Sequence, residues 1–187
     1  MTKSQYLTRC ALFCALGALL PQAFHCFGAV SGQAFLPMHL PAMCAGLFLG
    51  PTAGAITGLV SPLLSYLLTG GSMPILIKVP FMMLEVATYG AAAAVAFRLI
   101  GRVCRPCFVR TLLAVLCVQL AGRLVNVLTT VIAVYVLGVT HKAVTMTAVL
   151  ASVGAGLPGI VIQLLFLPTF LVTLQKITGT VASPTEK

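Results

Sequence analysis

Three charged side chains lie inside long apolar stretches of this 187-residue chain, and they are the first candidates for chemistry. Glu85 is the only acidic residue outside the C-terminal tail, Lys78 precedes it by seven residues, and Arg123 lies in the next apolar stretch. A charge inside an apolar span costs several kcal/mol unless it is paired or solvated. These three residues therefore indicate ion pairing, ligand binding or proton transfer.

Neutral polar residues extend this set. Gln119 and Asn126 lie four residues before and three residues after Arg123, so all three share one face of a helix. His39, among apolar residues and prolines, can either bond a neighbouring carbonyl or contact a ligand. The predicted substrate-binding residues are Lys78, Glu85, Gln119, Arg123, Asn126, His39 and Gln163.

The Glu85–Arg123 pair has two interpretations that the sequence leaves open. It can be an internal staple between two helices, since buried pairs are often neutral for stability. It can also belong to a polar cavity open to the outside, which Lys78 and the neighbouring amides favour. Tyr66 and Tyr89 are interpreted as packing residues.

The chain lacks the usual catalytic patterns. It contains no Asp, no G-x-x-x-x-G-K-[ST] phosphate loop and no HExxH motif. Hydrolysis of ATP by a Walker-type mechanism is therefore excluded. Cys104-Arg-Pro-Cys107 has CxxC spacing, but a zinc site needs two more ligands and none lies nearby in the sequence. We expect no enzymatic activity, no cofactor and no metal.

The composition predicts an integral membrane protein that forms one domain, residues 1–187. Hydrophobic residues make up 60% of the chain and charged residues 7%, with a mean hydropathy of +1.12. Soluble domains carry about 25% charged residues. The predicted fold is all-α, with six transmembrane helices at residues 6–24, 36–49, 52–68, 75–99, 111–137 and 148–174. The first is read as a membrane helix and not as a cleaved signal peptide.

These spans place the charged residues near the middle of the membrane. Glu85 lies about 15 Å into the fourth predicted span, and Arg123 about 20 Å into the fifth from the opposite side. Ala11 and Ala15 share one face of the first span, and glycines recur every four residues from Gly46 to Gly58. Small residues at such spacing permit close helix packing.

The basic residues predict the orientation. Six spans put both termini on one side, and that side collects Lys3, Arg9, Arg98, Arg102, Arg105, Arg110, Lys176 and Lys187. The positive-inside rule makes it the cytoplasm, so both termini are predicted to be cytoplasmic. The net charge of +9 is thus a topology signal, and nucleic-acid binding is not expected.

The chain resembles the substrate-specific S components of energy-coupling factor (ECF) transporters, which import vitamins in bacteria. The six-span layout and the Ala11–Ala15 pair match that family. The motifs that carry the resemblance are Leu36-Pro-Met-His-Leu-Pro, Ala45-Gly-Leu-Phe-Leu-Gly-Pro, Ser61-Pro-Leu-Leu-Ser-Tyr-Leu-Leu-Thr-Gly, Glu85-x-x-x-Tyr-Gly and Gly122-Arg.

The resemblance implies a multi-pass subunit in the bacterial cell membrane that captures a small vitamin-type substrate outside. The ligand would bind under the loop at residues 25–35 and against the last three helices. Ala11 and Ala15 would dock on a transmembrane coupling subunit, which sits on two cytosolic ATPases. Toppling of the S component in the lipid bilayer would then release the substrate inside. No motif here defines which vitamin is bound.

A self-sufficient permease, in which Glu85 carries a proton, is the alternative. The sequence favours the S component, because it shows no inverted repeat and only one acidic residue within the apolar spans. Proton relays in transporters usually use chains of such residues.

Overall fold

The computed structural model describes residues 2–25, 35–71, 74, 76–102, 107–136, 138, 141 and 144–178. Its regular elements are all helical, with no strand among the described residues. The elements are α1 (Lys3–His25), α3 (His39–Leu49), α4 (Pro51–Leu68), the 3₁₀ segment η1 (Leu76–Lys78), α5 (Val79–Gly101), α6 (Cys107–Val131), the π-helical segment η2 (Ile132–Val136), α7 (Met146–Ala155) and α8 (Leu157–Thr178).

Some predictions fall wholly or partly outside the described residues. They concern most of the loop at 25–35, the Cys104-Arg-Pro-Cys107 motif, most of the loop at 138–147 and the end of the tail. Three of the basic residues also lie outside the described residues: Arg105, Lys142 and Lys187.

The all-α membrane class is confirmed, and five of the six predicted spans have helices long and apolar enough to cross a bilayer. These segments are Lys3–Phe24, Pro51–Leu68, Leu76–Gly101, Phe108–Val136 and Leu157–Leu174. The remaining predicted span, residues 36–49, corresponds to α3, whose 11 residues extend only about 16 Å. A crossing needs about 20 residues. The count of six spans and the cytoplasmic location of the termini stay predictions.

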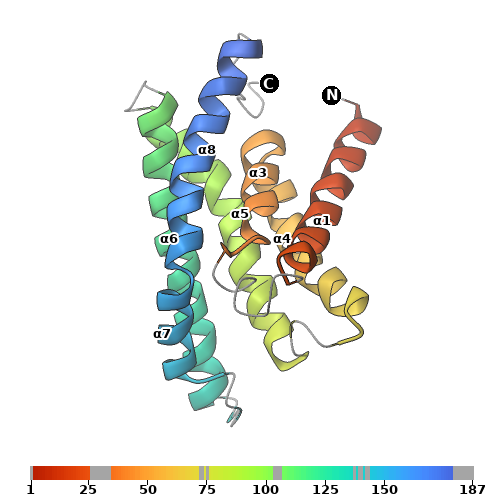
Figure 1. The fold of residues 1–187 in the computed structure, drawn as a ribbon, viewed down its shortest axis with the longest axis vertical. Coiled ribbons are helices and arrows are strands. Elements are labelled where there is room, and N and C mark those ends of the chain that lie inside the picture. The colour runs from red at the N-terminus through yellow and green to blue at the C-terminus, as the bar shows by residue number, and fades with distance from the viewer. Residues whose placement is uncertain are drawn as a thin grey trace.

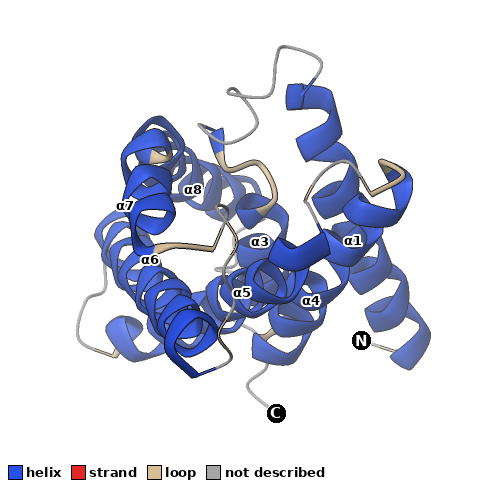
Figure 2. Cartoon of the chain, turned by 90° about the horizontal axis from the view of Figure 1, so that it is seen from below, coloured by secondary structure: helices blue, strands red, loops and turns tan. Residues whose placement is uncertain are grey.

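Helix α5 lies between two groups of helices (Figure 1). The view from below shows α6, α7 and α8 on one side of α3 and α5, with α1 and α4 on the other (Figure 2). Helix α5 packs against α3, α4 and α6, and α6 packs against α8. The beginning of α1 and the end of α8 lie at the same end of the bundle (Figure 1).

The last predicted span is two helices rather than one. Helix α7 ends at Ala155 and α8 begins at Leu157, with Gly156 between them. The Gly156 N–H still donates to the Ser152 carbonyl at 3.0 Å, so a helical hydrogen bond is kept at the bend between α7 and α8. Pro158 explains the break, because a proline has no N–H to donate to the preceding turn.

Glycines bring α3, α4 and α5 into backbone contact. A Cβ built on Gly46 or on Gly54 would overlap the Gly90 carbonyl, and one built on Gly58 would overlap the Ala87 backbone. The glycine repeat therefore marks a tightly packed three-helix contact, as predicted for small residues in membrane helices.

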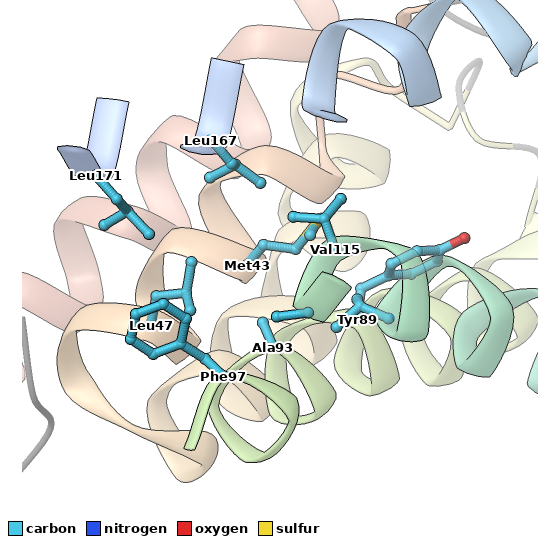
Figure 3. Packing of buried hydrophobic residues seen from close by; sticks show 10 residues of the cluster. Met43, Leu47, Tyr89, Ala93, Phe97, Val115, Leu167 and Leu171 are labelled. Carbon is cyan, nitrogen blue, oxygen red and sulfur yellow. The ribbon is translucent and has the colours of Figure 1, made fainter. Parts of the chain in front are cut away.

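A buried apolar cluster continues from this contact toward α6 and α8. Figure 3 shows Met43 and Leu47 of α3 beside residues of α5, with Leu167 and Leu171 of α8 nearby. In contrast, large leucines such as Leu120 and Leu150 are more than 70% exposed on the outside of the bundle. An apolar exterior of this kind is what a lipid-facing surface requires.

Helix α1 carries small residues on two different faces, one buried and one exposed. Cys10 and Cys14 are buried against α4, where the Cys14 thiol lies 3.8 Å from the Thr57 hydroxyl. Ala11 and Ala15 lie on the exposed face of the same helix. The predicted docking residues are therefore accessible in the isolated chain, and their role stays a prediction.

Candidate functional site

The centre of the site is Glu85, which α5 holds against α6. Arg123 Nη1 lies 3.6 Å from Glu85 Oε1, and Asn126 Nδ2 donates a hydrogen bond to Glu85 Oε2. The sequence predicted Glu85 and Arg123 to lie near the middle of the membrane on consecutive helices, and Asn126 to share a helical face with Arg123. Because both carboxylate oxygens have a partner, Glu85 fixes the position of the groups around it.

A second polar contact joins α6, α8 and the chain before α3. Gln119 Nε2 donates to Gln163 Oε1 at 2.6 Å, and Gln163 Nε2 lies 3.4 Å from the Leu36 carbonyl oxygen. Leu36 has φ +48°, a conformation that is uncommon for residues other than glycine. Gln163 is fully buried, so its two contacts hold three segments together inside the bundle.

His39 and Tyr89 form the third part of the site. Their rings meet edge to face with centroids 4.4 Å apart. His39 is 6% exposed and Tyr89 is fully buried. The Tyr89 ring joins the apolar cluster, while its hydroxyl points away from the labelled apolar side chains (Figure 3).

Several buried polar atoms in this region have no hydrogen-bond partner among the residues that the structure describes. They belong to only four of the described residues: His39 (Nδ1 and Nε2), Tyr89 (Oη), Gln119 (Oε1) and Arg123 (Nε and Nη2). Nearly all buried polar groups in proteins are hydrogen-bonded, and each unsatisfied one costs about 1–3 kcal/mol. Their concentration around one ion pair makes this region the candidate functional site.

Lys78 lies at the edge of this arrangement. It ends η1 immediately before α5 and is half-buried, seven residues before Glu85. The ion pair of Glu85 is made with Arg123, while Lys78 acts on the carboxylate from a greater distance.

Gly156 faces the guanidinium of Arg123 at the bend between α7 and α8. A Cβ built on Gly156 would lie 2.9 Å from Arg123 Nη2 and 3.1 Å from Leu36 Cδ1. The missing side chain therefore leaves room for the outer edge of this guanidinium. Sequence reasoning did not identify Gly156 as part of the site.

The interpretation of Tyr89 as a packing residue is confirmed by its place in the buried apolar cluster, but its buried hydroxyl, which has no partner among the described residues, was not anticipated. The spacing of four between Glu85 and Tyr89, which puts both on one helical face, was the available signal. Of the predicted residues, the structure brings Glu85, Arg123 and Asn126 into contact and joins Gln119 to Gln163. Within the described part of the chain, no three His, Cys, Asp or Glu residues group closely enough to hold a metal ion.

The fold and the candidate site define a helical membrane protein with a cluster of buried polar residues inside its bundle. The family model for the ECF transporter substrate-specific component matches residues 5–177, nearly the whole chain. The chain belongs to this family, which is one of transporter subunits and not of enzymes. No curated protein and no solved structure matches the chain.

Proposed function

We propose that this protein is the substrate-binding membrane subunit of an ECF-type importer for a vitamin or similar small micronutrient in the bacterial cell membrane. It captures the substrate outside and releases it inside by toppling on an ATP-driven coupling module. That module consists of a transmembrane coupling subunit and two cytosolic ATPases.

The observation that carries the proposal is the set of buried, unpartnered polar atoms around Glu85 and Arg123. A purely structural ion pair explains neither the free atoms of His39 nor the Tyr89 hydroxyl. A small polar molecule with several hydrogen-bonding groups would satisfy them together.

The position of the site is consistent with capture from outside. Glu85 lies six residues into α5, about 9 Å from the start of that helix. This start is at the opposite end of the bundle from the beginning of α1 and the end of α8 (Figure 1). With both termini in the cytoplasm, the site lies in the outer half of the membrane.

The energy source must be another protein or an ion gradient, because the sequence has no ATP-hydrolysing motif. The direct test is to express the tagged chain with a coupling subunit and two ATPases, purify it and identify retained small molecules by mass spectrometry. Co-purification of the module with a vitamin-type compound supports the proposal. Uptake that needs no module and stops when the proton gradient is removed would instead support the permease.

Docking is tested most sharply at Ala15. Ala15→Trp should abolish co-purification with the coupling subunit, because small residues permit close approach of helices. Binding of the retained small molecule by the isolated subunit should be unchanged, since Ala15 lies on the exposed face of α1.

The matched control for this variant is Leu120→Trp, which adds bulk at a 74% exposed position of α6. That helix lies in the group on the other side of α5 from α1 (Figure 1). Leu120→Trp should leave the complex intact. If the Ala15 variant assembles as well as the Leu120 variant, the docking face lies elsewhere.

A further inference from the structure

One edge of the Arg123 guanidinium is free although it is buried. Nη1 faces Glu85 Oε1, whereas Nε and Nη2 are buried and have no hydrogen-bond partner within the described part of the chain. These two atoms form one side of the planar group, and their N–H bonds point in parallel. Such an edge matches the two oxygens of a carboxylate in bidentate geometry.

The described residues around Arg123 fix the position of its guanidinium but do not provide hydrogen-bond acceptors for Nε and Nη2. Asn126 and Arg123 occupy the two oxygens of Glu85, so Glu85 holds Nη1 on the α5 side. Arg123 Nη2 faces Gly156, where no side chain intervenes. Nη2, at one end of the unpartnered edge, thus lies close to the bend between α7 and α8.

The charges of the site favour an anion with one negative charge. By formal charge, its groups among the described residues are the basic side chains of Lys78 and Arg123 and the acidic side chain of Glu85. One net positive charge is left, and an unbalanced charge in an apolar environment is costly. A monocarboxylate balances it, whereas a cation adds to it.

We infer that the ligand is a small carboxylic acid whose carboxylate binds the Nε–Nη2 edge of Arg123, with its remaining polar groups near His39 and Tyr89. This inference rests on the proposed function, because it names the substrate class of the same site. Tyr89 contributes a hydroxyl that donates or accepts, and a neutral His39 contributes one donor and one acceptor.

Acetate tests the inference without knowledge of the natural ligand. The full chain, labelled with ¹⁵N-arginine in detergent micelles, is titrated with acetate or acetamide at constant chloride, and the Nε–H resonances are followed by NMR. The Arg123 resonance, assigned by its loss in Arg123→Lys, should shift saturably with acetate. Acetamide should bind at least about tenfold more weakly, since charge-assisted hydrogen bonds are roughly twice as strong as neutral ones.

Arg110 is the internal control. Its Nε already donates to the Phe97 carbonyl at 3.1 Å, so its resonance should not respond to acetate. An equal response of both arginines, equal binding of acetate and acetamide, or no shift at Arg123 would overturn the inference. These outcomes are independent of module co-purification, so failure of acid recognition and failure of the proposed function are distinguished.

Two glycines in the same region provide matched variants. In Gly156→Ala the added methyl group would displace Arg123 Nη2, so acetate affinity should fall at least about tenfold with the loss of a charge-assisted contact. A Cβ on Gly154 meets nothing within 4 Å, and Gly154→Ala should bind acetate like the parent. Acetate affinity that is unchanged in Gly156→Ala would contradict binding at this edge.

Discussion

Arg123→Ala should lower the free energy of unfolding by about 3–5 kcal/mol, because it leaves the buried Glu85 carboxylate without its ionic partner. The effect is large because Glu85 is only 6% exposed and water cannot replace the guanidinium. Asn126 would remain as its single polar contact of those described here. Chemical denaturation of the purified protein in detergent measures the change.

The double variant Glu85→Gln with Arg123→Gln separates folding from binding. It removes both charges and keeps hydrogen-bonding amides, so its stability should lie closer to that of the parent than to that of Arg123→Ala. If the pair belongs to the site, this variant should fold but fail to bind the retained small molecule in calorimetry. Near-normal affinity would instead show that the pair is only a staple between α5 and α6.

Gly90→Ala should lower the free energy of unfolding by about 1–3 kcal/mol or more, as expected for overpacking of a close-packed interior. A Cβ on Gly90 would overlap the backbone carbonyl group of Gly54, which cannot rotate away as a side chain can. Helices α4 and α5 would have to separate. Thermal unfolding of the purified variant measures the cost.

Gly154→Ala is the matched control, since its added methyl group has open space. Alanine is favoured over glycine in helices by about 1 kcal/mol, so this variant should be as stable as the parent or slightly more stable. Equal stability of the two alanine variants would contradict the close contact between α4 and α5.

Much of the site could be predicted because its residues follow from depth and helical spacing. Glu85 and Arg123 are costly in an apolar span, and Asn126 lies one turn from Arg123, so these residues could be combined without a structure. The contact between Gln119 and Gln163 could not be specified in the same way. It joins residues 44 positions apart and depends on how α6 and α8 pack.

The fold, like the site, could be predicted in part from the sequence. Hydropathy located the long helices, and the proline at 158 was visible in the span that proved to be two helices. Gly156 was not identified, because its role comes from the approach of Arg123 on another helix. The interpretation of Tyr89 as a packing residue is confirmed by its place in the buried apolar cluster, but the position of its hydroxyl depends on tertiary packing and could not be predicted from the sequence.

The shortness of α3 has a consequence for the peptide groups at its beginning. The 11 residues of α3 cover only about half of a hydrocarbon layer about 30 Å thick, and the non-helical turn at residues 36–38 precedes the helix inside the bundle. Non-helical backbone within such a layer is tolerated only inside protein or beside a cavity. The Leu36 carbonyl meets this requirement by accepting from the His39 N–H at 3.2 Å and from Gln163. Gln163 thus donates to the Leu36 carbonyl the hydrogen bond that water would otherwise provide. This contact allows a short helix to begin inside the bundle beside the candidate site.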